Sequence, residues 1–252
     1  MKLTIITVSF NSAKTLERTI QSVISQNCPG LEYVIVDGGS TDGTVDIIRK
    51  YHASGHVTSF ISEKDAGISD AFNKGIAMST GDVIGMINSD DQYVPGALEK
   101  VHKIYEQQGT DFVLYGNMLR RSDSKTVRIR PRPLKRLWIY VDCPYDHPTV
   151  FVPKSVYDKV KPYNTNYRYS MDYDFYVRAM KAGVQFRYLD EDIAFFSTGG
   201  ISSRSARECH REVLRIQKAN GMFMPLSYLT YAMKMFVNLL KRALRWTTVC
   251  TL

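Results

Sequence analysis

The chain has 252 residues, of which 44% are apolar and 23% are charged, and its formal net charge is +8. This composition excludes a disordered protein, and the length is sufficient for one α/β domain with or without an appendage. The positive charge favours polyanionic partners, namely nucleic acid, an acidic membrane surface or phosphorylated substrates. The four cysteines form no CxxC pair, which argues against a zinc site or a disulfide framework and favours a reducing cytoplasm.

Apolar runs alternate with helical patterns over residues 1–90, which predicts a mostly parallel sheet. The first apolar run is short and has no cleavage site, so it predicts a buried strand rather than a signal peptide. The expected elements are a strand at 3–8, a helix over 16–24, a strand at 33–36, a helix through 45–49, a strand near 57–61, a helix over 70–78 and a strand at 83–87.

Polar residues follow three of these strands at the points where the strands end, in the segments 9–11, 37–42 and 88–91. Ligands of open parallel sheets bind beyond the carboxyl ends of the strands. The common placement of the three segments therefore predicts a ligand site at this edge of the sheet.

Acidic residues in two of these segments indicate the chemistry of the ligand. Asp90 and Asp91 are adjacent, and they repel each other unless a cation or hydrogen-bond donors neutralise them. Divalent ions such as Mg²⁺ and Mn²⁺ prefer oxygen ligands, and a diphosphate would supply more of them. Asp37 opens a glycine-containing turn and can accept a hydrogen bond from a nucleobase. The alternatives are a helix cap at Asp90 and Asp91 and an ordinary turn residue at Asp37.

The pattern changes in the second half of the chain. Eight basic residues from Arg120 to Arg136 are accompanied by one acid, Asp123, and by two prolines, which predicts a basic loop. A short strand is expected at 149–152, and a helix over 172–182.

The tail over 222–252 is rich in Met, Leu, Tyr and Phe, contains four basic residues and has no acidic residue. Lys234 and Asn238 interrupt its apolar run, so the run is too short and too polar to span a membrane. It predicts an amphipathic helix that lies on an anionic membrane surface. The alternative is a helix packed on its own domain or on a second subunit.

The segments TVSFN, LERTIQSVISQ, EYVIVDGGSTDGT and SEKDAGISDAFNKGIAMSTGDVIGMINSDD, followed by HPTVFV, YSMDYDFYVRAMKAG and FSTGGIS, together resemble family-2 glycosyltransferases. The resemblance covers residues 3–205 and is strongest to bacterial enzymes that build exopolysaccharide, capsule or O-antigen units. It implies an α/β GT-A fold over 1–221, with a nucleotide-sugar-binding half at 1–116 and an acceptor and catalytic-base half at 117–221. The tail over 222–252 would associate with the membrane.

The resemblance also implies which residues bind the base of the donor. Val8 and Phe10 would flank the nucleobase, and Asp37 would accept its N–H. The family usually has a second acidic residue directly after Asp37, where this chain has Gly38. This departure leaves Asp37 as the expected base contact.

Four further residues match donor-site positions of the family. Asp65 and Asn73 resemble its donor-binding residues. Asp90 would lie near the ribose, and Asp91 would hold a divalent metal, Mn²⁺ or Mg²⁺, on the diphosphate. The glycine-containing segment 199–202 resembles one that closes over the diphosphate.

Asp172 resembles the general base of an inverting transfer. A place at the start of a helix is expected to favour its ionised form, because the helix N-terminus attracts negative charge. Asp174 competes for this role, and many relatives have an acidic residue where this chain has Met171. His147 is open to two interpretations, contact with acceptor or metal and a structural histidine.

The implied reaction is transfer of a sugar from a nucleotide diphosphosugar to a glycan acceptor, expected to be linked to a polyprenyl diphosphate. The enzyme would be cytoplasmic and peripheral at the inner face of the cytoplasmic membrane. A nucleotidyltransferase would show a glycine-rich phosphate-binding loop after the first strand, which is missing here. A nucleic-acid partner would leave the acidic residues at the sheet edge unexplained. An inactive sugar-nucleotide-binding scaffold would differ by failing to hydrolyse the donor.

Overall fold

The computed structural model describes residues 1–26, 28–122, 125–131, 139, 143, 145–197 and 206–249, with side chains through 237 except at 122, 206 and 207. The strands are β1 Leu3–Ser9, β2 Glu32–Asp37, β3 Ser59–Ser62, β4 Val83–Asn88, β5 Gln92–Tyr93, β6 Phe112–Ser122, β7 Lys125–Ile129, β8 Val150–Pro153 and β9 Gln185–Ser197. The helices are α1 Leu16–Ile24, α2 Thr44–Ala53, α3 Ile68–Met78, α4 Ala97–Gln108, the 3₁₀ turn η2 His147–Thr149, α5 Lys154–Val160, α6 Met171–Lys181, α8 Ala206–Ala219 and α9 Met224–Val249.

The strands form one mixed sheet, and their order in the described chain is β3-β2-β1-β4-β8-β6-β9-β5, with β7 paired to β6. The first four strands of this order are parallel to one another, whereas β8 is antiparallel to both β4 and β6. The prediction of a mostly parallel sheet is confirmed. Strand β6 crosses the expected boundary between 1–116 and 117–221 without a break, so the two expected halves share one sheet.

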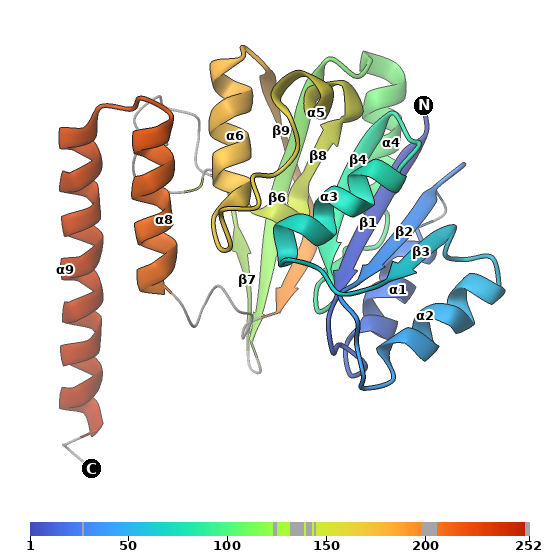
Figure 1. Ribbon diagram of the computed structural model, residues 1–252, viewed down its shortest axis with the longest axis horizontal. Coiled ribbons are helices and arrows are strands. Elements are labelled where there is room, and N and C mark those ends of the chain that lie inside the picture. Colours follow the sequence, from blue (N-terminus) through green and yellow to red (C-terminus); the bar gives the residue numbers. More distant parts are fainter. Residues whose placement is uncertain are drawn as a thin grey trace.

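Helices cover both faces of the sheet, which gives three layers (Figure 1). Strand β1 is buried on both faces and accordingly is almost wholly apolar or β-branched. Its residues alternate between two cores. Leu3 and Ile5 pack with residues of α1, α2 and α4, whereas Ile6 and Val8 pack with residues of α3, α5 and α6.

Most elements predicted for residues 1–90 are confirmed within a few residues. Strand β3 lies slightly later than expected, and α3 begins at Ile68, before the expected start of its helix. The predicted strand at 149–152 corresponds to β8, and the predicted helix over 172–182 corresponds to α6.

The basic segment is not the loop that its composition predicted. Strand β6 (Phe112–Ser122) pairs antiparallel with β7 (Lys125–Ile129), and residues 132–136 of the basic segment lie outside the described residues. Acidic residues of β9 compensate the charge, since Arg128 pairs with Asp192 at 2.5 Å and Arg130 with Asp190 at 3.5 Å. These partners are 60 or more positions away in the sequence, so the local pattern gave no sign of them.

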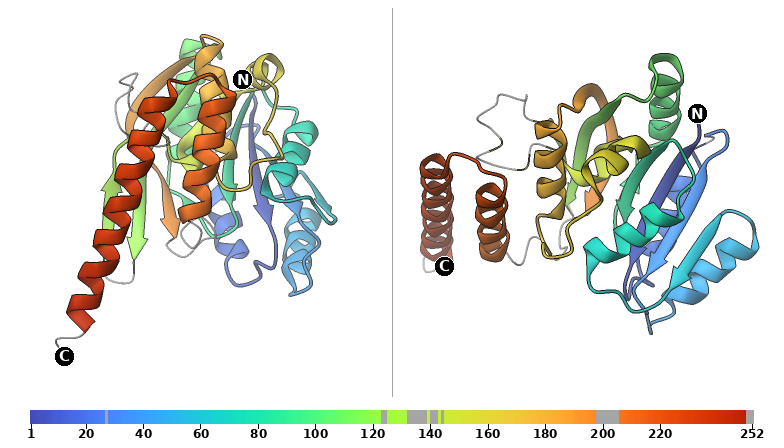
Figure 2. Two further views of the ribbon diagram at one scale, coloured as in Figure 1. Left: turned by 60° about the vertical axis from the view of Figure 1, so that its left-hand side comes forward. Right: turned by 45° about the horizontal axis from the view of Figure 1, so that its top comes forward.

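The two C-terminal helices form a separate layer beside the domain. Figure 2 shows α9 as the outermost helix, with α8 between it and α6. Among the helices of the described residues, none combines the length and the apolar character needed to cross a membrane.

Candidate active site at the carboxyl ends of the strands

The loops that follow β1, β2 and β4 are tied together by hydrogen bonds. The side-chain oxygen of Asn11 accepts the N–H of Thr41 at 3.0 Å, and the N–H of Asn11 donates to the hydroxyl of Ser40 at 2.8 Å. The hydroxyls of Ser12 and Ser89 lie 2.8 Å apart. The structure thus brings the three predicted polar segments to one edge of the sheet, the lower edge in Figure 1.

Asp37 is the last residue of β2 and is completely buried. Its Oδ1 accepts the hydroxyls of Ser9 at 3.0 Å and Ser40 at 2.5 Å. Its Oδ2 accepts the N–H groups of Gly39 at 3.1 Å and Ser40 at 2.9 Å and the hydroxyl of Ser62 at 2.8 Å. Through these five hydrogen bonds, Asp37 stabilises the conformation of the loop that follows β2. Its contact with a nucleobase stays a prediction, and it would require one of these donors to move.

Phe10 and Val8 are placed differently at the end of β1. The Phe10 side chain is 64% exposed, and an exposed aromatic ring offers a flat apolar face for a nucleobase. Val8 is only 7% exposed and packs in the core with residues of α3 and α6. Val8 therefore supports the site from beneath, and its contact with a base stays a prediction.

Asp65 lies in the loop before α3, and Asn73 lies within α3. Asp65 is half-buried, and its Oδ1 accepts the N–H of Gly67 at 2.9 Å. The Asn73 side chain donates to the carbonyl of Tyr163 at 2.8 Å and accepts the N–H of the same residue at 2.9 Å. Asn73 thus fastens the segment before α6 to α3, and contact with a donor stays a prediction.

Asp90 and Asp91 form the acidic pair that follows β4. Asp91 is 1% exposed, and within the described part of the chain its carboxylate accepts two hydrogen bonds, from the Asn88 side chain at 3.2 Å and the Ser197 N–H at 3.1 Å. Burial and the charge of Asp90 raise the pKa of Asp91 to about 7, and burial raises the pKa of Asp90. Ser197, the last residue of β9, contacts both acidic residues, because its hydroxyl also donates to the Asp90 carbonyl at 2.7 Å.

This acidic pair fits a divalent cation that a diphosphate helps to hold. Two neutral donors offset only part of the desolvation cost of a buried, ionised carboxylate, and a nearby cation would stabilise this ionised form. In the described part of the chain, no group of three or more His, Cys, Asp or Glu side chains is arranged around a metal position. Mg²⁺-like ions are commonly bound through one or two carboxylates plus substrate phosphates, so this sparse set matches that mode.

Asp172 lies in the first turn of α6, at the end that faces the same edge of the sheet (Figure 1). Its Oδ1 accepts the N–H of Tyr173 at 2.7 Å, and Cys143 Sγ lies 3.9 Å from its Oδ2. Its pKa is nevertheless raised to about 6, because burial outweighs the hydrogen bonds and the charge of Asp146 adds to the burial. The expectation that the helix start would favour ionisation is wrong in its net effect, since desolvation is larger.

Asp174 and His147 are held in structural contacts. Asp174 is buried and pairs with Arg178 at 2.8 Å. His147 packs against Phe72 with ring centroids 4.8 Å apart and ring planes tilted by 50°, and burial lowers its pKa to about 4, so it is neutral near pH 7. These contacts favour a structural role for both residues.

Glu212 of α8 is a residue that the sequence did not single out. Its carboxylate is buried and accepts the N–H groups of Arg168 at 2.8 Å, Tyr169 at 2.7 Å and Ser170 at 3.0 Å. These three residues immediately precede α6, so Glu212 fixes the start of the helix that carries Asp172. An isolated glutamate in a charged helix carries no signal of such a role.

The glycine-containing segment 199–202 lies outside the described residues. The neighbouring Ser197 is described, and its contacts with Asp90 and Asp91 show that the end of β9 reaches the acidic pair.

The comparisons with known proteins agree with this geometry. Residues 4–164 match the model of Glycosyl transferase family 2. The chain belongs to this family. This family 2 enzyme is 28% identical over 203 residues to the PGL/p-HBAD biosynthesis glycosyltransferase of Mycobacterium bovis (strain BCG / Pasteur 1173P2), covering 79% of this chain and 78% of the relative. It is 26% identical over 200 residues to the putative glycosyltransferase EpsE of Bacillus subtilis (strain 168), covering 75% and 70%.

Solved structures of glycosyltransferases share its fold. S. aureus TarS 1–349 in complex with UDP-GlcNAc matches 92% of this chain and 71% of its own, with a TM-score of 0.70 at 19% identity. The mannosyltransferase PcManGT from Pyrobaculum calidifontis, in complex with GDP-Man and Mn²⁺, matches 98% and 80%, with a TM-score of 0.65 at 13% identity. The predicted GT-A fold is confirmed. The protein is a family 2 glycosyltransferase with a GT-A fold.

Proposed function

We propose that this family 2 enzyme transfers a sugar, with inversion, from a nucleotide diphosphosugar to a hydroxyl of a lipid-linked glycan. The observation that carries the proposal is a pair of distinct carboxylate sites at one edge of the sheet. Asp90 and Asp91 form an under-compensated acidic pair, and Asp172 is a separate carboxylate whose pKa of about 6 suits a base near neutral pH.

The donor would lie across the ends of β1, β2 and β4. Phe10 would offer its exposed ring to the base, Asp90 would lie near the ribose, and Asp91 would hold a divalent metal, Mn²⁺ or Mg²⁺, at the diphosphate. When bound, such a metal supplies stabilisation of the negative charge on the departing diphosphate. Asp37 acts by holding its loop in shape, because its oxygens are filled by protein donors.

Asp172 would accept the proton of the acceptor hydroxyl as that oxygen attacks the anomeric carbon. The new bond forms on the face opposite the diphosphate, while the bond from the anomeric carbon to the diphosphate breaks and the nucleoside diphosphate leaves with the electron pair. A single displacement of this kind inverts the anomeric centre and requires one base. The structure offers one such carboxylate on α6, since Asp174 is already paired with Arg178.

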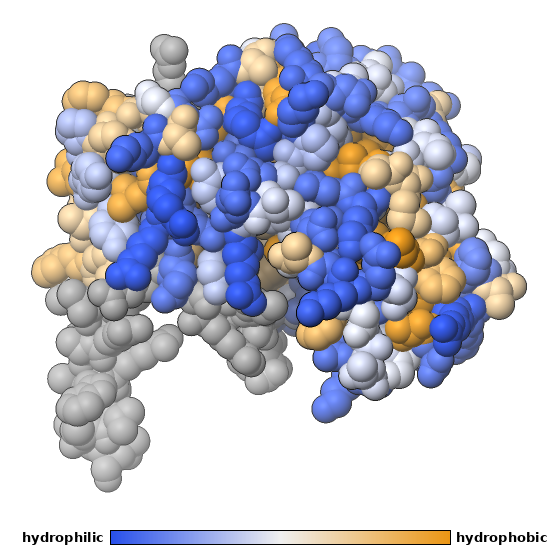
Figure 3. All heavy atoms as spheres, in the orientation of Figure 1, coloured by the Kyte–Doolittle hydropathy of each residue, from blue (hydrophilic) through white to orange (hydrophobic). Residues whose placement is uncertain are grey.

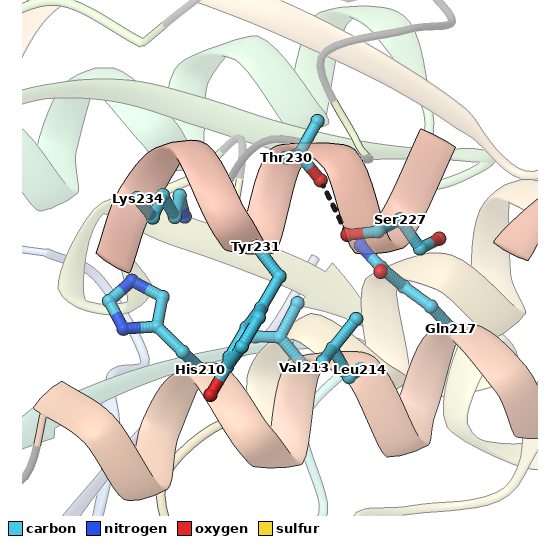
Figure 4. A pocket seen from close by; sticks show the side chains of 8 residues that line it. All are labelled: His210, Val213, Leu214, Gln217, Ser227, Thr230, Tyr231 and Lys234. Carbon is cyan, nitrogen blue, oxygen red and sulfur yellow. Dashed lines mark hydrogen bonds between the residues drawn. The ribbon is translucent and has the colours of Figure 1, made fainter. Parts of the chain in front are cut away.

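Helix α9 supports contact of this enzyme with an anionic membrane. It packs on α8 through Ser227, Thr230, Tyr231 and Lys234, which line a cavity of about 10 Å³ with residues of α8 (Figure 4). Five other large apolar side chains of α9 are exposed to solvent, namely Tyr228, Leu229, Met233, Phe236 and Val237. Apolar residues accordingly gather over α9 at the left edge of Figure 3.

Over the residues whose side chains are described, through 237, an apolar side of α9 is uncovered, and the sequence of the helix has basic residues and no acid. A helix of this kind binds the headgroup region of an anionic bilayer and does not need to cross it. Peripheral binding at the inner face of the cytoplasmic membrane would concentrate the enzyme where a polyprenyl-diphosphate-linked acceptor lies.

The proposed transfer is tested by thermal stabilisation and by turnover. UDP-, GDP- and dTDP-sugars are added with Mn²⁺ or with EDTA, and the melting temperature and the release of nucleoside diphosphate are measured. We expect at least one donor to stabilise the protein only when the metal is present, and to be slowly hydrolysed. Stabilisation of equal size with EDTA would contradict the role of Asp90 and Asp91, and no response to any donor would contradict the function.

A further inference from the structure

The loop after β2 contains a glycine whose backbone does not require one. The φ angle of Gly38 lies outside the left-handed region, so other residues can adopt its conformation. Space is the constraint, because a Cβ at this position would lie 2.7 Å from Oδ2 of Asp65 and 3.4 Å from Cδ2 of Phe10. The carboxylate of Asp65 thus occupies the volume that a side chain at position 38 would fill.

Asp65 also has an acceptor to offer. Its Oδ1 is taken by the N–H of Gly67, whereas its Oδ2 accepts no hydrogen bond from the residues that the structure describes. The exposed ring of Phe10 lies beside it across Gly38. A flat apolar face and a free carboxylate oxygen at its rim are the two contacts that a stacked base with a ring N–H would use.

We infer that Asp65, through the space left by Gly38, supplies the carboxylate that reads the nucleobase of the donor. The inference rests on the proposed function, because it deepens the donor site of that transfer. Asp37 is left with a bracing role, since its two oxygens already accept five protein hydrogen bonds.

This assignment selects a class of base. Uracil and thymine present a ring N–H at N3, and guanine presents one at N1 beside an amino group, so each donates to a carboxylate. Cytosine and adenine present an unprotonated ring nitrogen at the corresponding edge, whose lone pair would face the carboxylate and be repelled. The donor is therefore a uridine, thymidine or guanosine diphosphosugar, and cytidine and adenosine diphosphosugars are disfavoured.

Calorimetric titration of UDP, GDP, CDP and ADP with Mn²⁺ present tests the inference on the full chain. We expect UDP or GDP to bind the wild type best. In Asp65→Asn, the amide presents a donor to the ring N–H, so the affinity for that nucleotide should fall about tenfold to a hundredfold. The affinity for CDP should stay or rise, because the amide can donate to the ring nitrogen of cytosine. Glu63→Gln, which changes the same charge in the same loop at an exposed residue, is the matched control and should leave all four affinities unchanged.

The second test moves the carboxylate from position 65 to position 38. Asp65→Ala should lose affinity for the preferred nucleotide, and Gly38→Asp combined with Asp65→Ala should recover part of it. The inference is overturned if Asp65→Asn lowers all four affinities equally or none of them, or if the double variant binds no better than Asp65→Ala. It is also overturned if CDP or ADP binds the wild type as tightly as UDP and GDP. Absence of binding by all four nucleotides would contradict the proposed function as well, whereas the other outcomes leave that function standing.

Discussion

Asp91 is deeply buried, has two neutral hydrogen-bond donors among the residues that the structure describes, and has a second carboxylate next to it. An ionised group in such surroundings is stabilised by a cation, which connects its burial to the proposed metal role. The substitution Asp91→Asn keeps the shape and an oxygen that accepts the Ser197 N–H, and it removes the charge. Transfer should fall by about a hundredfold to a thousandfold, because a metal contributes several kcal/mol to the departure of the diphosphate.

The measurement is turnover with Mn²⁺, together with donor affinity in the presence and absence of the metal. Asp91→Asn should bind the donor with equal affinity in both conditions, and its melting temperature should not fall. Asp46→Asn, on the exposed face of α2, makes the same charge change away from the site and serves as the control. Full activity of Asp91→Asn in EDTA would contradict the assignment.

Asp172 differs from Asp91 because it has to gain a proton during the reaction. Asp172→Asn should keep the donor affinity and lose about two to four orders of magnitude in turnover, the usual contribution of a general base. A base with a pKa of about 6 is ionised above that pH and protonated below it. The wild-type rate should therefore be constant above about pH 7 and fall tenfold per pH unit below about pH 6, which a pH profile under saturating donor measures.

Asp174 provides the comparison for this experiment. It is buried and paired with Arg178, whose guanidinium also donates to the carbonyls of Lys161 and Pro162 at 2.9 Å. Asp174→Asn should therefore lower the melting temperature, and any loss of turnover should accompany loss of folded protein. A folded Asp174→Asn with intact donor affinity and no turnover would move the base from Asp172 to Asp174.

At the scale of the element, local sequence pattern predicted what local interactions decide. Strands β1, β2 and β4 are apolar runs bounded by turn residues, and α1 has its apolar residues at helical spacing, so each was visible in the sequence. The β6–β7 hairpin was not visible in the sequence, because the positive charge of its arginines is neutralised by ion pairs with Asp190 and Asp192 of the distant strand β9. The same limit applies to the site. The acids at strand ends were visible, whereas the five donors to Asp37 and the contact of Asp65 with Gly38 depend on how the loops meet.

Helix α8 acts on the site through Glu212. Its buried carboxylate accepts three successive N–H groups directly before α6, so it sets where that helix and Asp172 begin. In Glu212→Gln, the side-chain NH₂ group would face a backbone N–H group that the carboxylate accepts in the wild type, and two donors cannot form a hydrogen bond. Turnover should fall by about tenfold to a hundredfold while donor affinity stays unchanged, because a small displacement of the base is costly and the donor site is on other loops.

A role of Glu212 in positioning Asp172 is separated from a general loss of structure by comparing, in folded Glu212→Gln protein, the change in turnover with the change in donor affinity. Glu208→Gln, one turn earlier on α8 at an exposed residue, is the matched control and should behave as the wild type. Equal loss of donor affinity and turnover in Glu212→Gln would show that Glu212 acts on overall stability and not on the placement of Asp172.

At the scale of the whole molecule, the sequence predicted that the tail is an amphipathic helix, but it did not predict which side packs on the protein. A helix on a membrane surface and a helix packed on protein both have one buried side, and helical periodicity does not say which side packs on the protein. In the structure α9 turns Ser227, Thr230 and Lys234 toward α8 and leaves Leu229 and Phe236 exposed. The outward side is the one that a membrane or a second copy of the chain would cover.

Flotation of the full-length protein with vesicles tests the membrane contact. We expect it to float with anionic vesicles at low salt and less at high salt, because basic residues near an anionic surface contribute about 1 kcal/mol each and salt screens this attraction. Met233→Gln combined with Phe236→Gln should reduce flotation at both salt concentrations, since these two side chains are 60% and 62% exposed on the outward side of α9.

Val127→Gln removes an exposed apolar side chain from β7, a different element, and should float as the wild type does. Activity on a lipid-linked acceptor in vesicles should fall in the α9 variant, whereas donor hydrolysis in solution should not, because the donor site is on the opposite side of α8 and α6. Failure of the wild type to float under either salt condition would contradict membrane contact. If the mass of the wild type in solution is that of a dimer, and the α9 substitutions return it to a monomer, the uncovered side of α9 binds a second copy of the chain instead.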